Sequence, residues 1–250
     1  MLEEVREAGL VRSFHAATGS AIFRLGRLKG IDRPAIGALF PTKDPAQQVL
    51  VLDVGANMDA KPSYLHQWAL LGNIYSRDVL QVREPRIGLL NIGEEECKGN
   101  DQALKTYPLM AAETRFRFAG NCEGRDVLSG DFDVVVCDGF TGNVLLKFLE
   151  SVGSVLLDVL KAELPRGRRG KVGSAFLMSN LRRIKKRLDH AEHGGALLLG
   201  VNGVCVIGHG SSKALSVVSA LRIAHSAANH GVMDDLHRLS EAENTTVACG

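Results

Sequence analysis

Three polar side chains stand in glycine-rich turns where they could do chemistry on an anion. Lys98 lies in EECKGND, His209 in GHGSSKA and Asn121 in FAGNC. A lysine binds phosphate as a point charge, a histidine can titrate near neutral pH or donate to an oxyanion, and an asparagine is a neutral donor to a developing oxyanion. These residue types predict Lys98, His209 and Asn121 as catalytic residues.

Other polar and glycine residues in similar turns are predicted to bind the substrate. Glycine lets a ligand approach backbone amides, and the first amides of a helix favour an anion. The predicted substrate-binding residues are Asn57, Asn91, Gly99, Asn100, Asp138, Gly139, Thr141, Gly142, Asn143, Gly210, Ser211 and Ser212. Asn57 and Asn121 are expected in equivalent turns, and one of Asp138 and Asn143 is expected to cap the helix that starts near Thr141.

Each of these candidates also has a purely structural interpretation. A lone loop lysine is usually just solvated, and the acidic residues Glu94 to Glu96 could either hold Lys98 in place or repel an anion. GHGSSKA could be an ordinary turn from a strand to a helix. The chain has no GxSxG elbow, Walker loop, HExxH or GxGxxG after a strand. Serine hydrolysis, P-loop NTP hydrolysis and classical dinucleotide binding therefore lack their sequence signatures.

The turns follow four segments that are predicted to be buried strands. These are residues 48–54, RIGLLN, FRFAGN ending at Gly120-Asn121, and the VVVC run. Helices are predicted to start at Pro62, near Gln102 and near Thr141, the last running to about Leu164 with an apolar stripe that includes Val144, Leu145, Phe148, Leu149 and Val152. Such strand-turn-helix units predict an α/β fold with a mostly parallel sheet and helices on both faces. Ligands would bind outside the carboxyl ends of the strands.

The ends of the chain are less regular. The segment 31–44 is predicted as an extended piece between prolines, and residues 204–207 as a strand. Helices are predicted over about 16–28 and up to about Asn229. The whole chain is interpreted as a single domain of residues 1–250.

Composition excludes several classes of protein. The chain has 250 residues, 45% of them hydrophobic, and a formal charge of +2, which argues against a nucleic-acid binder. The start, MLEEVREAGL, lacks the apolar core of a signal peptide, so a cytoplasmic location is expected. The five cysteines never form a CxxC pair, which predicts neither a disulfide framework nor a metal site.

A basic segment over residues 164–193 interrupts this pattern. PRGRRGK and LRRIKKR hold nine of the thirty Lys and Arg residues and flank an apolar run from Val172 to Leu181. One interpretation is a solvated helix pair packed on the sheet. Another is an amphipathic helical insertion that contacts an anionic membrane surface, and a third is a contact with an acidic protein partner.

Several motifs, in order, resemble a known family. VLDVGAN, PRIGLLNIGEEECKGN, FAGNCEGRD, DVVVCDGFTGNVLLKFLE, HGGALLLGV and GHGSSKA are similar to the phosphate acyltransferase of bacterial phospholipid synthesis, the PlsX family. The resemblance runs from about Phe23 to about His230. It implies transfer of a fatty acyl group from acyl carrier protein to inorganic phosphate, without a cofactor. It also implies an isocitrate-dehydrogenase-like fold, a homodimer and peripheral attachment to the membrane.

Two departures from the family pattern accompany the resemblance. Family members usually begin with a DAMGGD-like strand and further strand-helix units, which are expected to be missing before Met1, and they carry an SAGNTGA-like turn where this chain has HAATGSA. Three functions therefore stay open: an active acyltransferase, a module that binds the carrier protein or the membrane without turnover, and an acyltransferase for short-chain acyl coenzyme A. The apolar run from Phe176 to Leu181 disfavours the last.

Overall fold

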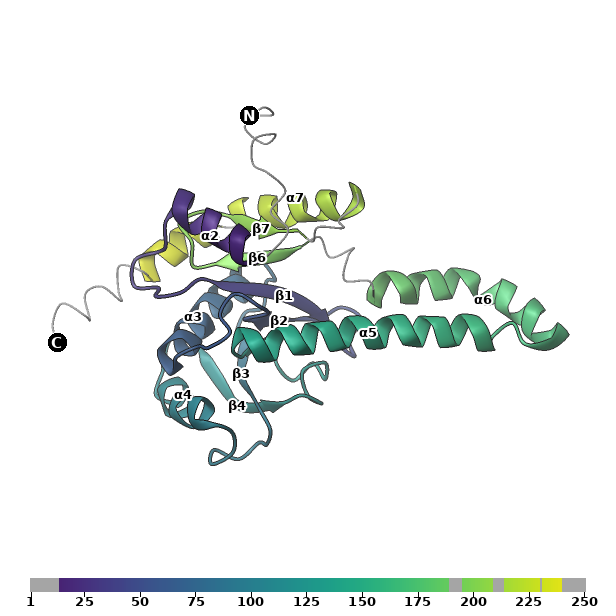
Figure 1. Cartoon of the computed structure of the whole chain (residues 1–250), viewed down its shortest axis with the longest axis horizontal. Helices are drawn as coiled ribbons and strands as arrows, with labels where there is room; N and C mark the ends of the chain where they lie inside the picture. Colours follow the sequence, from purple (N-terminus) through teal and green to yellow (C-terminus); the bar gives the residue numbers. More distant parts are fainter. Residues whose placement is uncertain (1–13, 189–194, 209–213, 230, 240–250) are drawn as a thin grey trace.

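The computed structural model describes residues 14–188, 195–208, 214–229 and 231–239. Figure 1 shows a sheet flanked by helices and a long helical hairpin that extends from it. The elements, in chain order, are α2 (Phe14–Leu25), β1 (Ala35–Pro41), β2 (Gln48–Leu52), α3 (Pro62–Asp78), β3 (Arg86–Asn91), α4 (Asp101–Ala111), β4 (Arg117–Glu123), β5 (Val134–Val136), α5 (Gly139–Glu163), α6 (Gly167–Leu188), β6 (Ala196–Leu199), β7 (Cys205–Ile207) and α7 (Ala214–Asn229).

The seven-stranded sheet is mixed, which corrects the prediction of a mostly parallel one. Its order is β4-β3-β5-β2-β1-β6-β7. The first four strands are parallel to one another, whereas β1 is antiparallel to both β2 and β6, and β7 is antiparallel to β6. For the pairs β1–β2 and β6–β7 the reason is loop length. Only residues 42–47 join β1 to β2 and only 200–204 join β6 to β7, and connections this short can form hairpins but not parallel crossovers.

Helices cover both faces of the sheet, as predicted. On one face α3 packs its buried Leu65, Trp68 and Leu71 against the strands. On the other face Ile22 of α2 and Leu145 and Leu149 of α5 pack against a second buried cluster. The apolar strands β2 and β5 are buried on both faces by this arrangement, which is why their sequences run without polar alternation.

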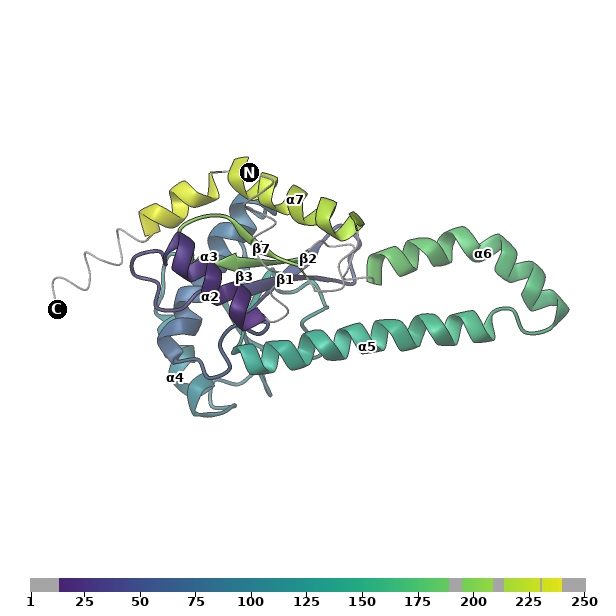
Figure 2. The same cartoon turned by 45° about the horizontal axis from the view of Figure 1, so that its top comes forward.

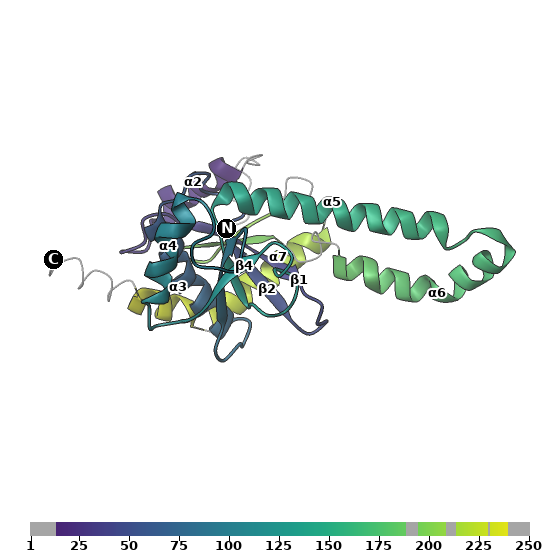
Figure 3. The same ribbon diagram turned by 90° about the horizontal axis from the view of Figure 1, so that it is seen from below.

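Helix α5 leaves the sheet and forms a hairpin with α6. Its 25 residues span about 37 Å at the usual rise, and Figures 2 and 3 show α6 returning beside it, away from the sheet. The basic segment is thus mostly helix α6, and it is not packed on the sheet. The predicted apolar stripe of α5 is divided, because Val144, Phe148 and Val152 remain exposed.

A glycine in the middle of α3 tests how tightly that helix packs on the sheet. A Cβ added at Gly72 would lie 2.7 Å from Val134 Cγ1 and 2.9 Å from Leu52 Cδ1. We expect Gly72→Ala to lower the free energy of unfolding by about 1–3 kcal/mol, measured by urea denaturation, because overpacking exceeds the gain in helix propensity. Gly19→Ala in α2, where a Cβ would meet nothing within 4 Å, is the control. Equal effects of the two substitutions would contradict this packing.

Candidate functional site

The candidate site lies where four parallel strands end. Strands β2, β5, β3 and β4 end at Leu52, Val136, Asn91 and Glu123. Because these strands are neighbours and parallel, the turns that follow them share one edge of the sheet. Most of the residues predicted to act on substrate stand in these turns.

The turn after β2 is built around the buried carboxylate of Asp53. Its Oδ1 accepts hydrogen bonds from the amides of Ile36, Gly55 and Ala56 at 3.0, 3.1 and 3.0 Å. Its Oδ2 accepts from the amide and the side-chain Nδ2 of Asn57 at 2.7 and 2.9 Å. Asp53 thereby fixes the shape of the turn and ties it to the start of β1.

The same burial affects the acidity of Asp53. The side chain has no exposed surface, and its removal from water raises the pKa above the ordinary value of 3.8, while the hydrogen bonds from Ala56, Asn57 and Ile36 act in the opposite direction. The N–H donors around both oxygens give Asp53 a structural role, which is to hold the turn after β2. This role requires no proton transfer between Asp53 and a ligand.

Asn57 belongs to this structural network. Its Nδ2 donates to the carbonyl of Pro34 at 2.8 Å as well as to Asp53. Both hydrogens of the amide group are therefore already used. Asn57, which the sequence predicts as a donor to an oxyanion, therefore holds the turn in place in this structure.

Two of the first backbone amides of α5 form hydrogen bonds within the protein. Asp138 is the N-cap, and its Oδ1 accepts from the Thr141 amide at 2.7 Å, as one of the two capping alternatives predicted. The Gly139 amide donates to the carbonyl of Asn57 at 2.7 Å. These bonds correct the expectation that the turn presents free amides to an anion, because two of the first amides are occupied.

Glycines at the start of α5 allow it to lie directly on the Asp53 turn. A Cβ at Gly139 would come within 3.0 Å of three backbone atoms of Asn57, and one at Gly142 would overlap the carbonyl oxygen of Asp53. Asn143 lies on the same side, with its Cγ 3.8 Å from the position of a Cβ on Gly55. The structure therefore brings the predicted residues of both turns together.

The turn after β3 carries Lys98 on an ordered loop. Asn91 Nδ2 donates to the Lys98 carbonyl at 3.0 Å, and Gly99 has a φ of +103° that only glycine adopts readily. Asn100 is the N-cap of α4, with its Oδ1 accepting from the Ala103 amide at 2.9 Å. Asn91 and Asn100 thus shape this loop, and the side chain of Lys98 is exposed at the edge.

Asn121 does not stand in a turn, which corrects the prediction that β4 ends at Gly120-Asn121. Strand β4 continues to Glu123, and Asn121 is 6% exposed within it. Its Nδ2 donates to the carbonyls of Glu95 and Glu94 at 2.9 and 3.4 Å. In this structure its donors support the loop that leads to Lys98, so it is placed to position that loop.

The two groups of turns meet through Gln102. Its Nε2 donates to the carbonyl of Ala60, which joins the start of α4 to the loop before α3. Lys61, the N-cap of α3, adds an exposed cation that the sequence reasoning missed. Its position after a strand-end turn and before Pro62 was the available signal.

The GHGSSKA motif follows a strand that runs in the opposite direction to β2. His209, Gly210, Ser211 and Ser212 lie outside the described residues. Strand β7 is antiparallel to β6, which itself runs parallel to β2, so β7 ends at Ile207 toward the other edge of the sheet. The strand directions therefore do not bring the end of β7 to the edge that carries Lys98 and Asn57.

Comparison with known proteins identifies the family. Residues 13–235 match the family described as fatty acid synthesis protein. A phosphate acyltransferase from Cyanothece is 61% identical over 236 residues, which are 94% of this chain and 69% of that protein. The chain belongs to this phosphate acyltransferase family.

Other members of the phosphate acyltransferase family are more similar to this chain but considerably longer. The one from Prochlorococcus marinus (strain MIT 9313) is 86% identical over 227 residues, which are 91% of this chain and 51% of that protein. The one from Synechococcus elongatus is 65% identical over 226 residues, covering 90% of this chain and 65% of that protein. The chain thus spans about half the length of the first of these relatives.

Solved structures show where the fold has been seen before. EutD phosphotransacetylase from Staphylococcus aureus aligns with a TM-score of 0.56 at 13% identity, covering 83% of this chain and 58% of that one. A branched-chain phosphotransacylase from Enterococcus faecalis aligns with a TM-score of 0.55 at 16% identity, covering 87% and 71%. At these identities the likeness concerns the fold alone.

Neither a membrane-spanning helix nor a cluster of metal ligands occurs among the described residues. None of the helices described is long and apolar enough to cross a membrane. Within the same residues, no group of three or more His, Cys, Asp or Glu side chains could hold a metal ion.

The Asp53 network predicts a large effect of a small substitution. In the parent protein, backbone amides donate to both oxygens of Asp53, so in Asp53→Asn the new NH2 group must face amide donors. We therefore expect the free energy of unfolding to fall by about 1–3 kcal/mol in urea denaturation. Asp138→Asn is the matched control, because asparagine is as good an N-cap as aspartate. A loss in Asp53→Asn no larger than that of the control would contradict the network.

Proposed function

We propose that this phosphate acyltransferase family member transfers a fatty acyl group from acyl carrier protein to inorganic phosphate. The observation that carries the proposal is 86% identity to a phosphate acyltransferase over 91% of the chain. Because the chain covers 51% of that relative, the activity, the substrates and the partners of the whole protein are part of the proposal. The acyl phosphate produced would serve phospholipid synthesis.

The proposed reaction needs positioning and charge more than a strong base. A phosphate oxygen attacks the carbonyl carbon of the thioester, the carbon–sulfur bond then breaks, and the pantetheine thiolate leaves with the electron pair. Phosphate already carries negative charge at neutral pH, so holding it in line with the carbonyl is the main task. The products are acyl phosphate and the free thiol of the carrier protein.

The edge formed by β2, β5 and β3 supports a division of roles. The exposed ammonium of Lys98 is the cation best placed to hold phosphate. Thr141 is exposed and Asn143 half-buried at the start of α5, where their side chains can reach a bound acyl donor. Asp53, Asn57, Asn91, Asn100 and Asn121 keep these turns in place. No role at this edge is proposed for His209, because the strand that precedes it in the chain ends toward the other edge of the sheet.

The partners in the proposal follow from surface features. The α6 sequence has eight Lys and Arg residues and no Asp or Glu, which suits the acidic surface of a carrier protein. Phe176 on the same helix is 82% exposed, which would suit peripheral contact with a membrane. The exposed Val144, Phe148 and Val152 on α5 would suit a homodimer.

A trapping assay tests the proposed activity. Purified protein is incubated with palmitoyl acyl carrier protein and phosphate, and acyl phosphate is converted to its hydroxamate with hydroxylamine. We expect hydroxamate well above the control without protein. If none forms while the carrier protein still binds, the chain is a binding module and the proposal of turnover fails.

Lys98→Ala tests where phosphate binds. Loss of a charge-assisted contact worth about 1.5–3 kcal/mol should raise the KM for phosphate roughly 10- to 100-fold and leave the KM for the acyl carrier protein close to that of the parent. Lys105→Ala is the matched control, because Lys105 is also exposed on this side of the fold but pairs with Asp101 at 2.7 Å. An unchanged phosphate KM in Lys98→Ala would remove Lys98 from the site.

A further inference from the structure

The turn after β3 carries three glutamates, and their carboxylates differ in their partners. Glu94 pairs with Arg125 at 3.3 Å, and Glu96 accepts a hydrogen bond from the hydroxyl of Tyr107 at 3.2 Å. The carboxylate of Glu95 has neither an ion pair nor a hydrogen bond with any residue that the structure describes. Of these three glutamates, Glu95 alone therefore keeps all its side-chain oxygens for a ligand.

Glu95 lies beside Lys98 because both side chains cross the same glycine. A Cβ added at Gly93 would lie 3.0 Å from Glu95 Oε2 and 2.9 Å from Lys98 Cγ. The backbone holds this arrangement, since the Lys98 amide donates to the Glu95 carbonyl at 3.1 Å and Asn121 Nδ2 donates to the same carbonyl at 2.9 Å. The carboxylate and the stem of the lysine therefore stand next to each other on an ordered turn.

The two opposite charges are both available to a ligand. Glu95 and Lys98 are exposed, and they do not form an ion pair with each other or with other residues in the described part of the chain. A ligand at this turn would meet an ammonium that only donates and a carboxylate that only accepts hydrogen bonds. Such a pair matches an anion that carries a hydroxyl donor of its own.

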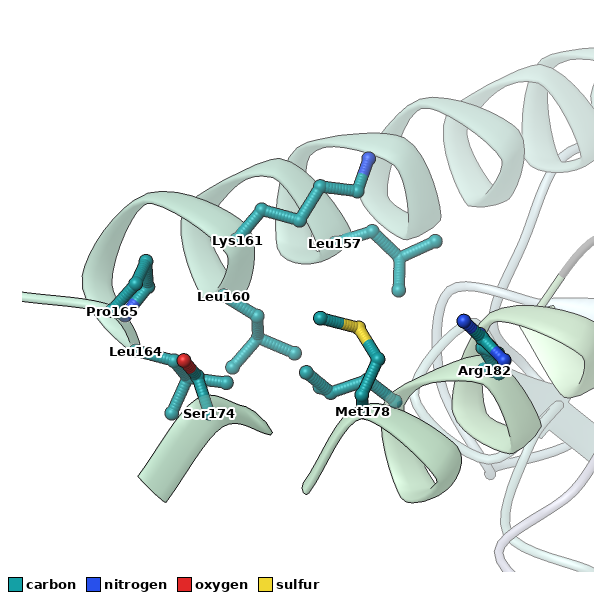
Figure 4. Close-up of a pocket in the computed structure, with 9 residues that line it drawn as sticks. Leu157, Leu160, Lys161, Leu164, Pro165, Ser174, Met178 and Arg182 are labelled. Atoms are coloured by element: carbon teal, nitrogen blue, oxygen red, sulfur yellow. The ribbon is translucent and has the colours of Figure 1, made fainter. Parts of the chain in front are cut away.

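The open cavity in the α5–α6 hairpin lacks this combination of groups. The residues that line it include Arg182 but no carboxylate (Figure 4). A cation without a neighbouring acceptor attracts anions of every kind, because charge alone does not distinguish them. The turn after β3 is thus better suited to select one anion.

We propose that Glu95 makes the phosphate site selective, by accepting a hydrogen bond from the P–OH group of hydrogen phosphate while Lys98 holds the other oxygens. Inorganic phosphate keeps a hydroxyl at neutral pH, whereas sulfate, a tetrahedral anion of similar size, has none. Sulfate would place an oxygen without hydrogen against the carboxylate, and two acceptors repel each other. This inference rests on the proposed function, because it requires phosphate beside Lys98.

Calorimetric titration of the full chain with phosphate and with sulfate, at neutral pH and constant ionic strength, tests the proposal. We expect the parent to bind phosphate at least about tenfold more tightly than sulfate, as for one charge-assisted hydrogen bond. The side-chain amide in Glu95→Gln can accept from phosphate or donate to sulfate, so the preference should disappear. Glu95→Asp keeps a carboxylate and should retain the preference.

Glu96→Gln is the matched control, because it removes the same charge from the same turn at a side chain that contacts Tyr107. It should change the affinities for both anions by the same factor and leave their ratio at the parent's value. Absence of saturable phosphate binding, equal affinities of the parent for the two anions, or an unchanged ratio in Glu95→Gln would each overturn the proposal.

Lys98→Ala separates this inference from the proposed function. If the substitution weakens phosphate binding while the ratio in Glu95→Gln stays at the parent's value, the phosphate site stands and the role of Glu95 is rejected. If phosphate binds to Lys98→Ala as tightly as to the parent, the site itself is rejected, and the selectivity proposed for Glu95 is rejected with it.

Discussion

The buried carboxylate of Asp53 is the interaction on which the candidate site depends. Five N–H groups from four residues donate to its two oxygens, which binds the turn after β2 to the start of β1. The Asn57 carbonyl in that turn then accepts the Gly139 amide at the start of α5. A charge removed from water is tolerated only when it is satisfied in this way, so the geometry of both turns follows from one side chain.

The directions of the strands distinguish two opposite edges of the sheet. Strands β2, β5, β3 and β4 bring their turns to one edge, where Lys98 is exposed. Helix α5 starts at that edge, crosses the sheet and carries the α5–α6 hairpin beyond the opposite edge (Figure 1).

Much of this site could be predicted from local patterns, but the remaining part depends on distant contacts. The sequence predicts that one of Asp138 and Asn143 caps α5, and the strand and helix periodicities locate β2, α3 and α4. The predicted end of β4 was wrong. Gly120-Asn121 has the composition of a turn, but pairing with β3 extends the strand to Glu123. Strand β6 was missed because ALLL is short and joins a glycine-rich hairpin. The role of Asn57 depends on Pro34 and Asp53, which no local pattern connects to it.

The central claim is that phosphate binds at the edge formed by the turns after β2, β3 and β5. The most direct measurement is a titration of ¹⁵N-labelled protein with inorganic phosphate, followed through the backbone amide signals. Saturable shifts should concentrate in residues 54–57, 93–99 and 138–143, and they should be much weaker in Lys98→Ala. Shifts confined to the α5–α6 hairpin, or to the opposite edge of the sheet, would contradict the account.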